Sequence, residues 1–254
     1  MRKLLFALLA LAALPAAALE IELSGFYELN RPSSLEYDPA FCGVWVANEG
    51  PEVILVTLDG LELRRFGSGL TRIKAITLDG PDVLVSDGLG RYQRLAKDGT
   101  PLGPPFRLGR LDVRTEGMVV DAEGALILVE DDPAQILWVD RAGNVLRRIE
   151  GDLLDPALTE PQGIARDPRT GHLLIVDDWE GTNALFEFDA EGRFLNTTPL
   201  IRYGRDPEGI AIRPGANLLF MAFDGGARIA AFDYTPTMAE GTVQLDPGAD
   251  CAIS

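Results

Sequence analysis

The stretch EPQGIARDPRTGHLLIVDD, residues 160–178, carries the pattern that decides the fold. Two apolar runs, QGIAR and HLLIVDD, flank the turn sequence D-P-R-T-G, and a third run of alternating polarity, ALFEFDAEG, follows at residues 184–192. Short apolar runs with a period of two, separated by turn residues, are typical of antiparallel strands. This part of the chain is therefore predicted to form one antiparallel unit.

Four other segments repeat this arrangement along the chain. Their openings are RPSSLEYDP at Arg31, RIKAITLDG at Arg72, RTEGMVVDAEG at Arg114 and DPEGIAIRPG at Asp206, so that the five openings are spaced by 41 to 46 residues. Each unit has three clear runs, and a weaker fourth follows in several, at 62–66, 145–149 and 193–197. Such units repeated about every 40 residues indicate a propeller, in which the first strand of each unit lines a central channel. We predict an all-β, five-bladed β-propeller of four-stranded antiparallel blades.

The fifth unit ends after its third strand, at Tyr234, and lacks an outer strand. Residues 21–29 (IELSGFYEL) or residues 242–245 could supply it, and we favour the N-terminal segment, which would close the ring and leave no unpaired edge in the last blade. Cys42 lies in the first turn of blade one and Cys251 near the C-terminus. A disulfide between them would join the end of the chain to the first blade. Two unpaired thiols are the alternative.

The N-terminal residues precede the repeats and have a different composition. Met1-Arg2-Lys3 is followed by LLFALLALAALPAAA, in which small residues stand at Ala16 and Ala18. A basic start, a short apolar stretch and an A-x-A site predict a secretory signal peptide over residues 1–18, with a single propeller domain over residues 19–254. A retained membrane anchor is the alternative. We expect a periplasmic or secreted protein without membrane insertion after cleavage, in a compartment that permits disulfides.

Composition excludes several classes of function. The net charge of −16 repels phosphate backbones, so nucleic acid is not an expected partner. No cluster of His and Cys suits zinc, and no glycine-rich phosphate loop is present. His172 is the one histidine, and the repeat pattern places it on the face opposite the acidic residues, so a Ser-His-Asp hydrolase is not expected.

Acidic residues recur at equivalent positions of the repeats. The loop entering the first strand and the loop leaving the second lie on one face of a propeller, and most of the residues there are acidic. The entering positions are Ser33, Lys74, Glu116, Gln162 and Glu208, and the leaving positions are Asn48-Glu49, Asp87, Glu130-Asp131-Asp132, Asp177-Asp178 and Asp224. Oxygen-rich sites suit Ca²⁺ and, less well, Mg²⁺. We predict a divalent-cation site at the channel mouth, with Glu116, Glu208, Asp87, Asp131 and Asp178 as ligands. Solvated turn acids are the alternative.

The openings x-E-G-[IMLV]-[AV], the run D-P-x-T-G-x-L-L-[IV]-V-D-D and the run L-F-E-F-D-x-E-G resemble the SdiA-regulated (YjiK-like) family of secreted bacterial β-propellers over Ser33 to Tyr234. NHL-repeat and SMP-30-type propellers show a weaker similarity. The resemblance implies a periplasmic propeller without an established activity that binds Ca²⁺ near its channel. The family's entering glutamates match Glu116 and Glu208, whereas Ser33, Lys74 and Gln162 depart from that pattern.

These observations lead to one prediction and two alternatives. The prediction is a monomeric, secreted or periplasmic module that binds or scaffolds a small molecule or protein at the channel face, with Ca²⁺ as cofactor. The first alternative is a metal-assisted hydrolase of phosphoesters, lactones or glycosides that uses the same acidic pocket. The second is a module that binds basic proteins through its acidic rim.

Overall fold

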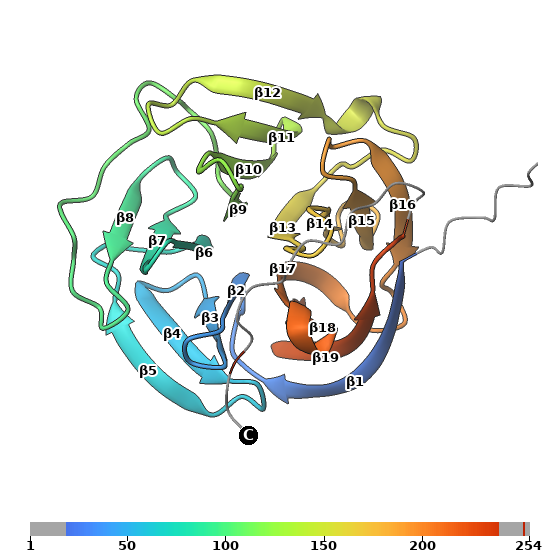
Figure 1. Ribbon diagram of the computed structural model, residues 1–254, viewed down its shortest axis with the longest axis horizontal. Coiled ribbons are helices and arrows are strands. Elements are labelled where there is room, and N and C mark those ends of the chain that lie inside the picture. Colours follow the sequence, from blue (N-terminus) through green and yellow to red (C-terminus); the bar gives the residue numbers. More distant parts are fainter. Residues whose placement is uncertain (1–18, 239–250, 252–254) are drawn as a thin grey trace, which may run out of the picture.

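The computed structural model describes residues 19–238 and 251, and the chain forms five antiparallel sheets arranged around a central channel (Figure 1). The chain is a five-bladed β-propeller. The sequence-based prediction of this architecture is confirmed, and the blades follow one another in chain order around the ring. No helix in the described part of the chain is long and apolar enough to span a membrane.

Each blade runs from the channel outward in the order of its strands. Blade 1 contains β2 (Ser34–Asp38), β3 (Gly43–Ala47), β4 (Glu52–Thr57) and β5 (Glu62–Gly67). Blade 2 contains β6 (Ala75–Asp79), β7 (Asp82–Ser86) and β8 (Tyr92–Leu95). Blade 3 contains β9 (Gly117–Val120), β10 (Leu126–Asp131), β11 (Ala134–Val139) and β12 (Val145–Glu150). Blade 4 contains β13 (Pro161–Arg166), β14 (Leu173–Asp177), β15 (Ala184–Phe188) and β16 (Phe194–Pro199).

Blade 5 closes the ring by using both ends of the propeller. It contains β17 (Arg205–Arg213), β18 (Leu218–Gly225) and β19 (Arg228–Thr235), and its outermost strand is β1 (Glu20–Glu28). The register of β1 on β19 runs from Glu20 opposite Thr235 to Glu28 opposite Arg228. The prediction that an N-terminal strand closes the ring is therefore confirmed. Residues 1–18, the predicted signal peptide, and residues 242–245 lie outside the described residues.

Blade 2 departs from the four-stranded pattern. In the place of a fourth strand, the segment after β8 makes two isolated bridges, between Tyr92 and Phe106 and between Leu95 and Pro101. This segment has the sequence PLGPPF at 101–106, and its three prolines have no N–H to donate to a ladder. The segment therefore lies beside the blade without forming a continuous strand.

A disulfide joins Cys42, in the turn between β2 and β3, to Cys251, with 5.1 Å between their Cα atoms. The predicted pairing is confirmed. The bond ties the C-terminal part of the chain to blade 1, across a sequence separation of 209 residues. In the chain-entropy picture, so long a loop makes the bond a stabilising constraint on the unfolded chain.

The blades pack through apolar side chains that fill the spaces between neighbouring sheets. One buried cluster joins Val119 and Ile127 of blade 3 to Ile175 and Phe186 of blade 4. Near the channel the innermost strands approach so closely that only glycine fits. A Cβ atom on Gly163 would lie 2.5 Å from the carbonyl oxygen of Glu208 and 2.8 Å from the Cα atom of Gly209. The innermost strands therefore form a tight ring, as expected for glycine at this repeat position.

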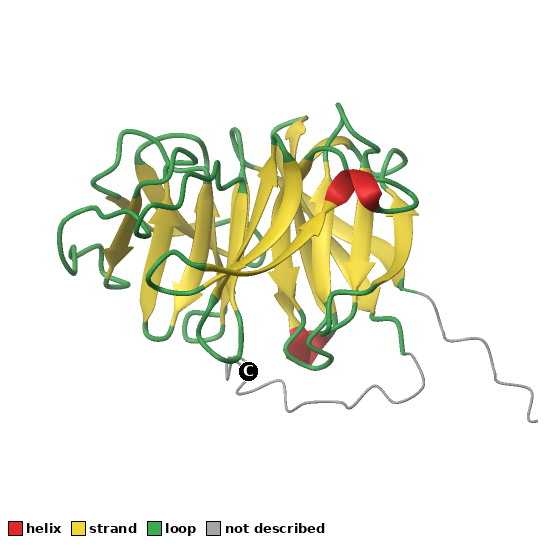
Figure 2. Ribbon diagram, turned by 90° about the horizontal axis from the view of Figure 1, so that it is seen from above, coloured by secondary structure: helices red, strands yellow, loops and turns green. Residues whose placement is uncertain are grey.

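All five innermost strands run in one direction, so the channel has two chemically distinct ends. The strands begin at the upper face in Figure 2, on the side of the short 3₁₀ helix η1 (Gly151–Leu153). They end at the lower face, near the second 3₁₀ helix, η2 (Pro214–Ala216). We call the first end the upper mouth and the second the lower end.

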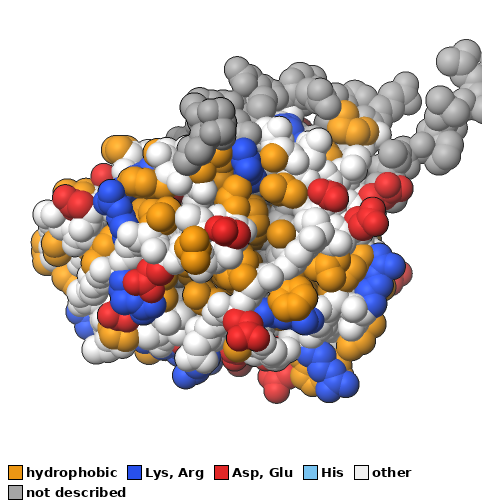
Figure 3. Space-filling view, turned by 90° about the horizontal axis from the view of Figure 1, so that it is seen from below, with side chains coloured by type: hydrophobic (Ala, Val, Ile, Leu, Met, Phe, Trp, Pro, Cys, Tyr) orange, Lys and Arg blue, Asp and Glu red, His pale blue; other side chains and the backbone are white. Residues whose placement is uncertain are grey.

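The outer edge of the disc carries apolar and charged side chains side by side. Figure 3 views this edge and shows hydrophobic side chains among basic and acidic ones. Exposed apolar residues include Leu23 and Phe26 of β1 and Leu61 and Leu63 in or next to β5. Arg65, for example, pairs with Glu62 at 2.6 Å and with Glu52 at 2.8 Å. Charges on an outer strand disfavour pairing with another sheet.

Candidate functional site

The five entering positions come together at the upper mouth, and Lys74 lies at their centre. Its ammonium nitrogen lies 2.8 Å from Oε2 of Glu208 and 3.2 Å from Oε2 of Glu116, which come from blades 5 and 3. The Lys74 side chain is only 7% exposed. The repeat alignment therefore predicted correctly that residues far apart in the chain converge here.

Glu49, from the loop that leaves β3, joins this group from the side. Its carboxylate lies 3.6 Å from the ammonium of Lys74 and 2.9 Å from the guanidinium of Arg72, and it also pairs with Arg31. Burial by itself would raise the pKa of Glu49, but the three cations outweigh burial and hold the pKa below its ordinary value. Glu49 therefore stays charged and contributes to holding Lys74 in place.

Burial acts in the same direction on the two entering glutamates. It raises the pKa of Glu208 to about 7, although Lys74 opposes the shift and Asp206 adds to it. Burial also raises the pKa of Glu116, again opposed by Lys74. Lys74 itself keeps a pKa above its ordinary value because the carboxylates outweigh its burial. The mouth therefore holds more carboxyl groups than its one ammonium can neutralise.

Three of the acids form a group that could hold a metal ion. Asp178, Asp206 and Glu208 each offer an oxygen atom, and these oxygens lie within 4.8 Å of one another. Glu208 and Asp178 were predicted as ligands, but Asp206 was not. Asp206 lies two residues before Glu208 and opens the fifth repeat. Its place at the start of β17, an innermost strand, was the signal that would have put it on the upper face.

The pKa values of Asp206 and Asp178 are both raised. Burial raises the pKa of Asp206, and the charge of Asp224 adds to the shift. Burial also raises the pKa of Asp178, and backbone N–H groups of Glu180 and Gly181 partly oppose it by donating to Oδ1. A bound cation would relieve both effects because it favours the charged carboxylates.

The other three predicted ligands are engaged elsewhere. Oδ1 of Asp87 accepts the backbone N–H groups of Leu89 and Arg91, at 2.7 and 3.0 Å, and so shapes its own turn. Oδ1 of Asp131 accepts the N–H of the next residue at 2.7 Å. Glu116 pairs with Lys74. Among the described residues, none of these three belongs to the group of carboxylates that could share a metal ion.

Asp177, the neighbour of Asp178, has a structural role. Its Oδ1 accepts the N–H groups of Thr159 and Glu160 at 3.0 and 2.6 Å, and its Oδ2 accepts two bonds of 2.6 Å from Thr182. Asp177 is fully buried. The aspartate pair at the end of β14 is therefore divided, since Asp177 organises the loops and Asp178 faces the mouth.

Gln162 supplies a further oxygen at the mouth. It is 5% exposed, and its Oε1 atom has no hydrogen-bond partner. A buried amide oxygen without a partner carries a free-energy cost that a ligand can remove. Gln162 stands between Glu116 and Glu208 in the order of the blades, and its neighbour Gly163 packs against the backbone of Glu208. The amide therefore lies in the part of the ring nearest the acidic group.

The available donors fit a hard cation. Three carboxylates and an amide oxygen are the ligand types that Ca²⁺ prefers, with water completing its six to eight positions. The ammonium of Lys74, at 2.8 Å from Oε2 of Glu208, competes for one of these ligands and repels a second cation. Such a site is therefore expected to bind a divalent cation weakly.

The remaining features of the upper face offer a surface for a larger ligand. Trp179, which follows Asp178, is 47% exposed, and the guanidinium of Arg205 lies 4.2 Å from the centre of its ring. His172 is not part of this face. It is buried on the other side of blade 4, where its Nδ1 lies 2.9 Å from Glu187, as the repeat pattern indicated.

The chain was compared with known proteins. No family model matches it, and no curated protein matches it by sequence. It is similar in structure to the glutaminyl cyclase of Myxococcus xanthus, with a TM-score of 0.65 and 12% identity, over 86% of this chain and 97% of that one. It is also similar to a β-propeller domain from Myceliophteria thermophila, with a TM-score of 0.53 and 10% identity, over 85% of this chain and 100% of that one.

At these identities the likeness shows the propeller fold and nothing finer. Membership of the SdiA-regulated family stays a prediction, because no family model matches. The function of the upper mouth therefore has to follow from the chemistry of its own residues.

Proposed function

We propose that the protein is a binding module whose upper mouth holds a divalent cation, Ca²⁺ in the first place, between Asp178, Asp206 and Glu208. The observation that carries the proposal is the approach of these three carboxylates to within 4.8 Å. The unpartnered Oε1 of Gln162 supports it independently, because it adds a fourth oxygen that lacks a donor. The bound cation would form the floor of a ligand site, with Trp179 at its edge.

The expected affinity follows from the competing ammonium. With three carboxylates and Lys74 close by, we expect a Kd of about 10⁻⁴ to 10⁻³ M, the range of extracellular calcium modules. At 10 mM Ca²⁺, such a site would stabilise the folded protein by about 1.4 to 2.7 kcal/mol. That corresponds to a rise of several degrees in the unfolding midpoint of a chain of this size.

The experiment is thermal unfolding after EDTA treatment, then with Ca²⁺, Mg²⁺ or Na⁺ of equal ionic strength. We expect Ca²⁺ to raise the midpoint most. Asp206→Asn should abolish the rise and leave the fold intact, because Asp206 has φ of 64°, a conformation that Asn tolerates well. Asp112→Asn, an exposed acid in the loop leading into β9, removes the same charge and should keep the rise. Equal midpoints with all three cations would refute the cation site.

The proposal includes a periplasmic or secreted location. The disulfide between Cys42 and Cys251 supports it, because disulfides form and persist in oxidising compartments. Cleavage after Ala18 is part of the same proposal. N-terminal sequencing of protein recovered from the periplasm and the culture medium tests both, and cytoplasmic protein that retains Met1 would contradict them.

The second candidate is a hydrolase that uses the same pocket with a bound metal. The observation in its favour is the contact of Lys74 with Glu208 and Glu116, which places an ammonium group and two carboxyl groups within proton-transfer reach. A panel of phosphoesters, lactones and glycosides tests it. Turnover that Glu116→Gln abolishes would replace the binding module with an enzyme.

A further inference from the structure

The lower end of the channel contains a cavity that is separate from the acidic mouth. Its volume is about 240 Å³, and all five blades contribute to its lining of fourteen residues. The residues come from the ends of the innermost strands and the turns that follow them, for example Thr77 of β6 and Ile210 of β17. Of these fourteen residues, Glu36 alone carries a carboxyl group.

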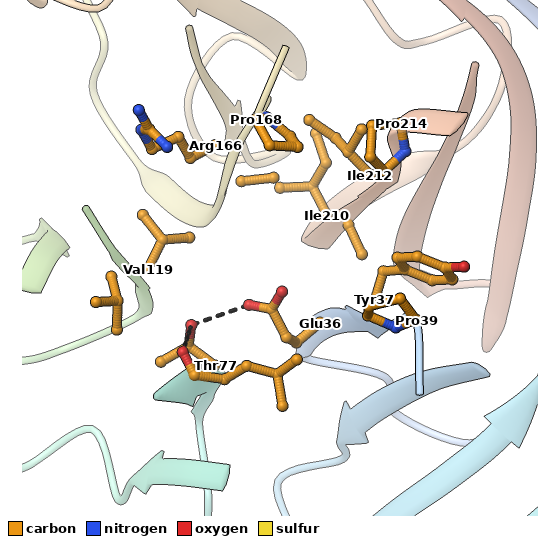
Figure 4. A pocket seen from close by; sticks show the side chains of 14 residues that line it. Glu36, Tyr37, Pro39, Thr77, Val119, Arg166, Pro168, Ile210, Ile212 and Pro214 are labelled. Carbon is orange, nitrogen blue, oxygen red and sulfur yellow. Dashed lines mark hydrogen bonds between the residues drawn. The ribbon is translucent and has the colours of Figure 1, made fainter. Parts of the chain in front are cut away.

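The carboxyl group of Glu36 points into an apolar space. Figure 4 shows it at the middle of the cavity, with Val119 on one side and Ile210 on the other. Ile212, Pro39 and other aliphatic side chains complete the walls. The cavity therefore combines mainly apolar side chains with the carboxyl group of Glu36, the hydroxyl of Thr77 and the guanidinium of Arg166. Mainly apolar walls with a few polar groups are the usual composition of a small-molecule site, in which the polar groups set orientation.

Within the described residues Glu36 makes no ion pair. Its Oε2 accepts a hydrogen bond of 2.9 Å from Oγ1 of Thr77, drawn as a dashed line in Figure 4. Of the other charges nearby, Asp38 pairs with Lys97 at 2.8 Å. Arg166 also lines the cavity, and one of its guanidinium nitrogens lies on the side of Gly171, in the turn after β13.

The surroundings disfavour the charged form of Glu36. Burial raises its pKa to about 7, and the charge of Asp38 adds to the shift. The hydroxyl of Thr77, the backbone at Leu78 and the charge of Lys97 oppose it. A carboxylate in this position therefore lacks a counter-charge, and a cationic ligand would provide one.

We propose that this cavity binds a small organic cation, a primary alkylammonium, whose charged end pairs with Glu36 and whose alkyl chain packs on Val119, Ile210 and Ile212. The size of the cavity corresponds to roughly eight water molecules of about 30 Å³ each, so the ligand has a handful of non-hydrogen atoms. An anion would meet an acidic protein of net charge −16 and the carboxylate itself. A neutral ligand would leave that carboxylate without a counter-charge.

Binding must be linked to protons. Below pH 7 the carboxyl group of Glu36 holds a proton, and an ammonium ion can pair with it only after the proton leaves. The affinity should therefore rise about tenfold per pH unit up to pH 7 and level off above it. Asp38, Lys97 and Arg166 are the other charged groups that face the cavity or Glu36.

The experiment is a titration of the purified protein with n-butylammonium, followed by calorimetry and by NMR of the protein methyl groups. At pH 8 we expect binding with shifts at the Val119 and Ile210 methyl groups. At pH 6 we expect at least fivefold weaker binding and release of roughly one proton per ligand, measured in two buffers of different ionisation heat. n-Butanol and butyrate, which have the same chain, should bind at least tenfold more weakly.

Two variants and one control test whether the ligand binds in the cavity. Glu36→Gln should lose the preference for the ammonium over the alcohol, and Val119→Phe should block both by filling the space. Glu123→Gln removes an acid from the exposed turn between β9 and β10, on the same face, and should bind as the parent does. Unfolding midpoints confirm that each variant is folded.

Two results would overturn the inference: equal affinity for n-butylammonium and n-butanol, or unchanged binding of the amine in Glu36→Gln. The test does not depend on the upper mouth, since it is done in EDTA without added metal. A failed cation site and a failed amine site are therefore separate outcomes.

Discussion

The two ends of the channel use the same scaffold and treat carboxyl groups in opposite ways. At the upper mouth Glu208 and Glu116 are buried together with Lys74, which holds them through contacts of 2.8 and 3.2 Å. At the lower end Glu36 is half-buried among mainly aliphatic side chains, with one hydroxyl donor. Burial raises the pKa of Glu208 and of Glu36 to about 7. The main cause of the shift is therefore the same at both ends, but Lys74 opposes it for Glu208 and mainly the hydroxyl of Thr77 opposes it for Glu36.

The comparison teaches that the place of a residue along the innermost strand decides its chemistry. Residues that start these strands meet the loops of the neighbouring blades, and charges from all five blades come together there. Residues that end the strands meet mainly aliphatic side chains and prolines. We expect replacement of Lys74 at the upper mouth to lower the free energy of unfolding and replacement of Glu36 at the lower end to raise it.

The largest effect is expected from Lys74→Met at the upper mouth. Loss of the ammonium leaves three carboxylates facing one another, and removing one partner of a buried ion pair is strongly destabilising. We expect a loss of about 3 kcal/mol in the free energy of unfolding at pH 8, measured with urea. The loss should shrink at pH 5, where the carboxyl groups can take up protons. Ca²⁺ should bind this variant more tightly than the parent. The double variant Lys74→Met/Glu208→Gln should recover part of the lost free energy of unfolding. No recovery would show that the two side chains do not interact energetically.

The next effect concerns the tight ring between the two ends. Gly163→Ala would place a Cβ atom 2.5 Å from the carbonyl oxygen of Glu208, and backbone atoms cannot move aside cheaply. We expect a loss of about 2 kcal/mol, with disturbance of both ends. Gly67→Ala, at a strand position with no atom within 4 Å of the added carbon, should change stability by less than about 0.5 kcal/mol. Comparable losses of stability in both variants would mean that the innermost strands can accommodate a Cβ atom at Gly163.

An effect of similar size and opposite sign is expected from Glu36→Gln at the lower end. The pKa of Glu36 is about 7 in the folded protein and 4.5 as its ordinary value, so the folded state binds more protons between these pH values. The parent therefore loses stability as pH rises from 4.5 to 7, and the amide variant does not. We expect Glu36→Gln to be more stable by about 2 kcal/mol at pH 8 and equal to the parent at pH 4. Glu123→Gln keeps Glu36 and should therefore lose stability with rising pH as the parent does. A parent curve parallel to that of Glu36→Gln would contradict the prediction.

The smallest effect is expected from Asp206→Asn without a divalent cation. Burial and the charge of Asp224 both disfavour the carboxylate of Asp206, so neutralising it should stabilise the protein by about 0.5 kcal/mol. Saturating Ca²⁺ should reverse the order and make the parent the more stable protein. Thermal unfolding with and without Ca²⁺ measures this exchange. The same order under both conditions would show that the acidic group gains nothing from the ion.

The sequence predicted the fold in detail where a local pattern repeats. The apolar runs and D-P or D-G turns gave strand positions within one or two residues, and the incomplete fifth unit implied the role of residues 21–29. Blade 2 is the exception, because prolines in segment 101–106 prevent a continuous outer strand. That departure was readable from the composition of the segment, since proline removes the donors that a ladder needs.

The candidate site was predictable only in part. Repeat alignment placed Glu116, Glu208 and Asp178 on one face, and the structure adds that Asp178 and Glu208 share a group with Asp206. The repeat alignment could not show that the carboxylate of Asp87 accepts hydrogen bonds from N–H groups of its own loop, because these bonds depend on the loop conformation. It also could not show that Glu36 faces a cavity, because a single acid within a strand looks like an ordinary exposed position.

By itself, the sequence determined the number of blades, because period and turn residues are local properties of the chain; it favoured one of two closing strands and one pairing of its two cysteines. Only the tertiary structure decided which acids lie close enough to share a cation, that Lys74 contacts three carboxylates, and that Glu36 lines a cavity. The physical reason is that pairing, burial and pKa depend on atoms from different blades, and their distances arise only when the ring closes.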